Sequence, residues 1–103
     1  MLKFGFASTK LAPLAMRLGS CLGVSFQRHE SDLRGGQYFR AETLQGTIFL
    51  QTNFDVIDHA PVEQGWPPHG SVLYLDGPDD NSWQPVVERL LAAKNELGLS
   101  ILV

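Results

Sequence analysis

Cysteine is nearly absent from this chain, since its 103 residues include only Cys21. A single cysteine excludes an internal disulfide, which is typical of proteins in the reducing cytoplasm. The sequence also lacks any run of roughly 18 apolar residues, and its N-terminal apolar residues are too few and too interrupted for a signal peptide. We therefore expect a cytoplasmic chain without a membrane-spanning helix.

Signatures of catalysis and metal binding are missing as well. The three histidines, His29, His59 and His69, do not have the paired spacing of a zinc site. Gly35 and Gly36 lack the further glycine and the Lys-Ser/Thr pair of a phosphate-binding loop. The chain has no GxSxG motif and no cysteine–histidine arrangement that would indicate a nucleophile. We therefore expect no enzymatic activity, no cofactor and no metal.

Basic residues are missing from one long stretch, because no Lys or Arg lies between Ala41 and Glu88. Residues 1–50 carry six basic and three acidic side chains, whereas residues 51–103 carry two basic and eight acidic ones. A surface with this charge disfavours nucleic acid and attracts a basic protein.

The residues that are present predict one domain over residues 1–103, with 44% apolar and 18% charged side chains. The clearest pattern lies at residues 24–54, where side chains alternate as in three consecutive strands. Gly35 and Gly36 would form the first turn and Gly46 the second. Further strands are expected at residues 2–6 and 71–75, with an optional last strand at 100–103.

Two helices are also expected. An apolar stripe at helical spacing marks the first, with Leu11, Leu14, Ala15 and Leu18. Thr9 would cap this helix and Gly19 would end it, and a start at Pro13 is the alternative. The second would begin at Asn81 or Ser82, end at Gly98 and bury Val86, Val87, Leu90, Leu91 and Leu97.

These elements together predict an α+β fold, with a mostly antiparallel sheet of four to six strands and two helices packed on one face. If the first strand and the strand after the first helix are parallel, the connection between them is expected to be a right-handed crossover. The exact strand order does not follow from the sequence.

Residues 52–70 show no period and contain prolines, glycines and acids, which is typical of a functional loop. The acidic and aromatic residues of this loop and of the turn after the next strand make up a candidate partner-binding site: Asp55, Asp58, Glu63, Trp66, His69, Asp76, Asp79 and Asp80. Their carboxylates would attract a basic partner and Trp66 would supply an apolar anchor. A solvated acidic surface is the plainer interpretation.

A second candidate site surrounds the first predicted turn. Arg28 and Arg40 could bind an oxyanion, and His29 could act in acid–base chemistry. The same arginines could instead pair with Glu30, Asp32 or Glu42. This region is the basis of an alternative hypothesis, a small enzyme or ligand-binding domain.

One further pattern extends over residues 24–97. A strand ends in serine, a GG-Y-F element starts the next strand, and an asparagine precedes an acidic loop; the residues are Ser31, Gly35, Gly36, Tyr38, Phe39 and Asn53. This pattern resembles small immunity proteins of bacterial toxin systems, in particular those of contact-dependent growth inhibition. The resemblance implies a cytoplasmic, non-catalytic protein that neutralises a cognate toxin, often a nuclease with a basic groove, by covering it.

We therefore expect an immunity protein that inhibits a basic toxin domain through protein–protein interaction. A structural subunit that docks on another protein through its acidic surface is a third hypothesis. The sequence does not give the identity of the toxin or the oligomeric state.

Overall fold

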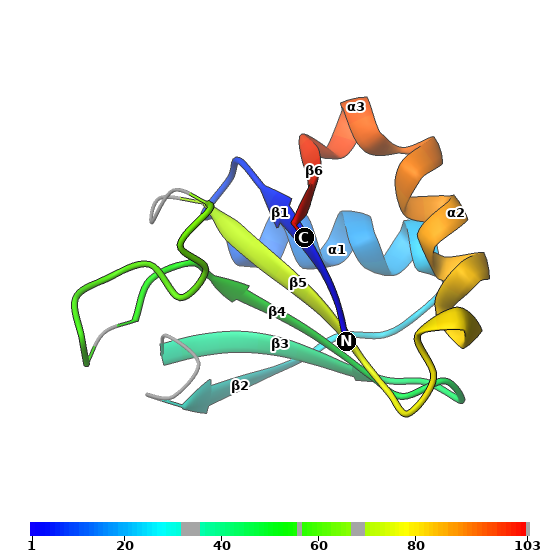
Figure 1. The fold of residues 1–103 in the computed structure, drawn as a ribbon, viewed down its shortest axis with the longest axis horizontal. Coiled ribbons are helices and arrows are strands. Elements are labelled where there is room, and N and C mark those ends of the chain that lie inside the picture. Colours follow the sequence, from blue (N-terminus) through cyan, green and yellow to red (C-terminus); the bar gives the residue numbers. More distant parts are fainter. Residues whose placement is uncertain (32–35, 56, 67–69, 103) are drawn as a thin grey trace.

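The computed structural model describes residues 1–31, 36–55, 57–66 and 70–102. It confirms an α+β fold, in which a six-stranded antiparallel sheet carries helices on one face (Figure 1). The elements are β1 (Leu2–Phe6), α1 (Leu11–Leu22), β2 (Gln27–Ser31), β3 (Gly36–Glu42), β4 (Thr47–Thr52), β5 (Ser71–Asp76), the short 3-10 helix η2 (Asp80–Trp83), α2 (Gln84–Ala92), α3 (Lys94–Leu97) and β6 (Leu99–Leu102).

The strands follow the order β2-β3-β4-β5-β1-β6. The predicted three-strand segment is confirmed, although its first strand begins at Gln27 rather than at Val24. Gly36 starts β3 at a φ of 95°, and Gly35 lies outside the described residues. Because β3, β4 and β5 separate β1 from β2, α1 crosses over the sheet and does not connect neighbouring strands.

Helix α1 is longer than the sequence predicts. It begins at Leu11 without a side-chain cap, so the expected cap at Thr9 is wrong, and it ends before Gly23, whose φ is 68°. Gly19 lies inside the helix, where a Cβ would be 2.9 Å from the Val24 carbonyl oxygen. This glycine permits close packing of the chain and does not terminate the helix.

The predicted second helix is divided into η2, α2 and α3, and α2 ends where Ala93 leaves the helical conformation. The side chain of Asp79 accepts a hydrogen bond from the Asn81 amide and so caps η2, in place of the predicted Asn81 or Ser82. Leu91 is 40% exposed, so its predicted place on the buried face is wrong. Gly98 ends α3 at a φ of 65°, as predicted.

The hydrophobic core lies between the helices and the face of the sheet that they cover. Its largest members come from β1, α1, β4, β5, η2 and α2: Phe4, Phe6, Leu14, Leu18, Ile48, Leu50, Leu73, Leu75, Trp83 and Leu90. None of the helices in the described ranges is both long and apolar enough to cross a membrane. None of the described helices lies on the opposite face of the sheet, which is called the open face below (Figure 1).

Candidate functional site

The strand register places two rows of side chains across the open face. Successive residues of a strand point to opposite faces of the sheet, whereas paired residues on neighbouring strands point to the same face. One row contains His29, Tyr38, Gln51, Val72 and Gly5, and the next contains Gln27, Arg40, Phe49, Tyr74 and Lys3. The centre of the open face is therefore aromatic and polar.

The aromatic rings of this face contact one another across strands. The rings of His29 and Tyr38 stack with centroids 5.4 Å apart, and the ring of Tyr38 lies 6.2 Å from that of Phe49. The guanidinium of Arg40 lies 5.6 Å from the centroid of Phe49. These contacts hold the rings in a continuous patch.

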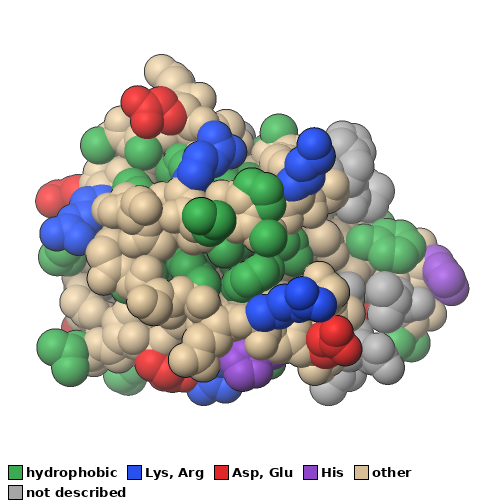
Figure 2. Space-filling view, turned by 180° about the vertical axis from the view of Figure 1, so that it is seen from behind, with side chains coloured by type: hydrophobic (Ala, Val, Ile, Leu, Met, Phe, Trp, Pro, Cys, Tyr) green, Lys and Arg blue, Asp and Glu red, His purple; other side chains and the backbone are tan. Residues whose placement is uncertain are grey.

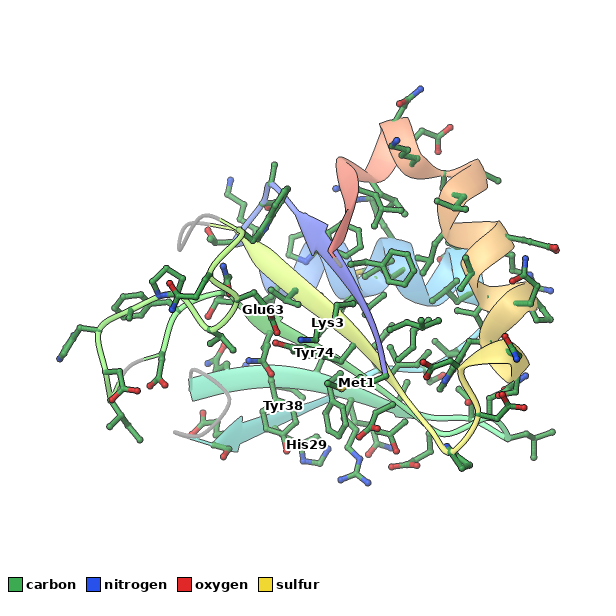
Figure 3. All side chains as sticks on the ribbon, viewed as in Figure 1. Met1, Lys3, His29, Tyr38, Glu63 and Tyr74 are labelled. Carbon is green, nitrogen blue, oxygen red and sulfur yellow. The ribbon has the colours of Figure 1, made fainter. Side chains whose placement is uncertain are left out.

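A polar cluster lies beside this patch and joins three elements. The hydroxyl of Tyr74 donates to Glu63 Oε1 at 2.8 Å, and the ammonium of Lys3 lies 3.2 Å from the same oxygen. Figure 3 shows Lys3, Glu63 and Tyr74 pointing toward one another, with Tyr38 and His29 side by side on the neighbouring strands. Since Glu63 belongs to the β4–β5 loop, this cluster fastens the loop to the sheet.

The cluster borders a pocket of about 370 Å³ on the open face, lined by Met1, Ser31, Phe49, Gln51, Val62, Glu63 and Tyr74. Gln51 and Tyr74 are buried at its floor. Among the described residues, no three His, Cys, Asp or Glu side chains lie close enough to hold a metal ion.

Asn53 fixes the loop after β4 in place, and its side chain is fully buried. Its Nδ2 donates to the carbonyls of Glu63 and Trp66, at 3.1 and 2.6 Å, while its Oδ1 accepts from the Glu63 amide at 2.7 Å. The Asn53 side chain thus supplies hydrogen-bond partners to the backbone groups of Glu63 and Trp66, which would otherwise need water or other backbone groups.

Trp66 completes this attachment and is half-buried. Its Nε1 donates to the Phe6 carbonyl at 3.0 Å, and its ring lies over Gly5 in β1. The prediction of Trp66 as an exposed anchor therefore differs from its position, because the indole is engaged within the chain.

The outer part of the loop carries the exposed residues. Asp55 Oδ1 accepts hydrogen bonds from the amides of Ile57 and Asp58, and so it forms the turn. His59 completes the turn at a φ of 54°. Asp58 is exposed, and Ile57 is 60% exposed. An acidic and an apolar side chain are thus presented next to each other.

The second acidic group lies at the other end of β5, roughly 17 Å away for a strand of this length. Asp76 and Glu42 flank Thr47 in the strand register, and Asp80 pairs with the N-terminal ammonium at 2.7 Å. Asp79 is the cap of η2. The predicted carboxylates are therefore not one cluster but two groups, at opposite ends of the strands, and His69 lies outside the described residues.

Glu42 is held ionised by its neighbours. Arg40 Nε donates to Glu42 Oε1 at 2.6 Å, and the Thr47 hydroxyl donates to Oε2 at 3.0 Å. The hydrogen bond from Arg40, followed by that from Thr47, lowers the pKa of Glu42 below its ordinary value of 4.5.

The alternative site is only partly assembled. His29 and Arg40 line a second pocket of about 370 Å³ on the open face, together with Ser25, Gln27 and Glu42. Arg28 is opposite Phe39 in the register and lies on the helix side of the sheet. It contacts Glu30 at 3.9 Å, and both side chains are exposed.

The sequence interpretation missed Lys3, Phe49, Gln51 and Tyr74, and it named Asn53 only as part of the resemblance, with no contact assigned to it. A signal for Phe49 and Gln51 was present, since they alternate with the apolar residues Ile48 and Leu50. No local pattern indicated the contacts of Lys3 or Asn53. Comparisons with protein-family models, curated proteins and solved structures gave no match for this chain.

Proposed function

We propose that the chain is an immunity protein, of the kind that acts in contact-dependent growth inhibition. In this proposal the chain binds a basic toxin domain and covers the active site or substrate groove of that toxin. We expect the toxin to be a nuclease. The open face is the binding surface, and the outer part of the β4–β5 loop extends it.

One observation carries this proposal: the open face has an aromatic centre with carboxylates at both of its ends. Interfaces commonly combine a central patch rich in Tyr and Phe with a charged rim. Here Tyr38 and Phe49 lie at the centre, with Asp58 beyond one end and Asp76 at the other. The rim would attract a basic surface and orient it before contact.

The attachment of the loop supports the same proposal. Asn53, Glu63 and Trp66 hold its base while Ile57 and Asp58 are exposed. A loop whose base is held by such contacts loses less conformational entropy when a partner binds than a loop without them. The loop therefore suits recognition of a preformed protein surface.

The proposal implies a toxin gene next to the gene of this chain, and the toxin domain of that neighbour is the partner in the test. Asp58→Lys combined with Asp76→Lys should raise the Kd at least about tenfold at low salt, mainly through a slower association rate. The matched control is Glu88→Lys combined with Glu96→Lys, which makes the same charge change on exposed residues of α2 and α3. Stopped-flow measurements at two salt concentrations give the association rate constants of both double variants.

An equal loss of toxin affinity in the two double variants would contradict binding through the open face. Failure of the unaltered chain to bind the toxin domain, or to restore growth when the two are co-expressed, would contradict the immunity function itself.

The pocket that contains His29 and Arg40 supports a second candidate, a small ligand-binding domain or enzyme. A screen of anionic metabolites by thermal shift tests it, with His29→Ala and Arg40→Ala as variants. A ligand whose stabilisation is lost in both variants would favour this candidate over the immunity function.

A further inference from the structure

The helix-covered side of the molecule has an apolar groove that the open face does not include. It lies between α1 and the β2–β3 edge of the sheet and has a volume of about 490 Å³. Phe26 and Phe39 line it, together with Met16 and Gly19 of α1 and with Val24 of the connection between α1 and β2. The groove exists because α1 packs on β3 and β4, while the edge strand β2 lies away from the helices that the structure describes (Figure 1).

A second hollow, of about 620 Å³, lies on the other flank of α1 and is lined by Arg17, Cys21, Ala93, Glu96 and Leu97. Met16 and Ser20 line both hollows, so they form the ridge between them. Met16 is 76% exposed. Figure 2 shows hydrophobic side chains gathered in a hollow on this side, with Lys and Arg side chains on either side of it.

The charge around the groove is basic. Apart from Lys3, which pairs with Glu63 on the open face, the charged side chains of residues 1–29 are those of Lys10, Arg17 and Arg28, and this stretch has no acidic residue. Arg28 is opposite Phe39 in the register, so its side chain borders the groove from the sheet side. Its ion pair with Glu30, at 3.9 Å between exposed groups, is weak and leaves the guanidinium accessible to a partner.

We infer that this groove binds an amphipathic segment of a partner protein, with apolar side chains facing Phe26 and Phe39 and carboxylates facing the arginines. Apolar burial supplies the affinity, and the basic border selects acidic segments. The inference is independent of the proposed function, because that function uses the open face and a basic partner. The chain thus has two binding surfaces, of which the open face prefers a basic partner and the groove an acidic one.

The probes are two synthetic helical peptides of about 16 residues with the same leucine-rich face, one carrying Glu on its polar face and the other Lys. Fluorescence anisotropy should give a Kd for the Glu peptide at least about tenfold below that for the Lys peptide, and this difference should shrink at high salt. Backbone amide shifts in NMR should change at Met16 and Phe26.

Met16→Glu should weaken binding of the Glu peptide at least about tenfold. The matched control is Leu44→Glu, which places the same charge on a fully exposed leucine of the β3–β4 turn and should leave the Kd unchanged. Equal binding of both peptides, binding of neither, or equal effects of the two variants would overturn the inference. A concentration-dependent dimer that Met16→Glu abolishes would also overturn it, since a second copy would then occupy the groove.

Discussion

The indole of Trp66 lies so close over Gly5 that a Cβ at residue 5 would be 2.8 Å from two ring atoms. Gly5 is buried in β1, and Trp66 belongs to the loop between β4 and β5. The absence of a side chain at Gly5 therefore allows the β4–β5 loop to pack against β1.

Gly5→Ala should destabilise the chain because the new methyl group overlaps the indole. We expect a loss of about 1–3 kcal/mol in the free energy of unfolding, measured by urea denaturation. Gly65→Ala is the control, since a Cβ there meets no atom within 4 Å. A loss in the control as large as that of Gly5→Ala would contradict the steric explanation.

Asn53→Ala should remove the hydrogen bonds to Glu63 and Trp66 and leave their backbone groups without this partner. The expected loss of stability is roughly 2–3 kcal/mol, together with faster amide exchange in the loop. Asn95→Ala, at an exposed residue of α3, should change stability by less than about 0.5 kcal/mol. Unchanged exchange at the Glu63 amide would show that Asn53 does not hold the loop.

Glu42 should titrate below 4.5, because the hydrogen bonds from Arg40 and Thr47 favour its ionised form. A lowered folded-state pKa means that this contribution to stability is present above about pH 4.5 and is lost as the pH falls through the folded value. NMR titration of the side-chain carboxyl should show Arg40→Leu raising the pKa toward 4.5, and Thr47→Val raising it less.

Arg28→Leu is the control for this titration, because Arg28 lies on the other face of the sheet. An unchanged Glu42 titration in Arg40→Leu would disprove the assigned cause.

Two adjacent leucines of α2 should respond very differently to truncation. Leu90 is fully buried and Leu91 is 40% exposed. Leu90→Ala should lower the free energy of unfolding by about 2–5 kcal/mol, and Leu91→Ala by less than about 1 kcal/mol. Similar losses, measured by thermal or urea unfolding, would contradict the orientation of α2.

The sequence predicted the type of each helix and strand better than the residues at which it begins and ends. Alternation in residues 24–54 and the apolar run at 71–75 located four strands, because such patterns are local in the sequence. The end of α1 was placed wrongly because Gly19 has the residue type of a terminator, while its actual role depends on Val24 approaching it. The residue that ends α1 is Gly23, four positions later, and both glycines have the residue type of a terminator.

The candidate site was predicted in part for the same reason. Acidic residues can be counted in a sequence, but their separation into two groups depends on β5, which has one group at each end. The engagement of Glu63 by Lys3 and of Trp66 by Phe6 joins residues 60 positions apart. Contacts of this kind leave no periodic signal.

The position of β1 has a consequence for the order in which the molecule is made. Its two neighbours are β5 and β6, and both follow it in the chain. During synthesis on the ribosome, β1 has no strand to pair with until residues 71–76 have been translated. Strands β2, β3 and β4 are translated before β5, so they can pair with one another while β1 still lacks both of its partners.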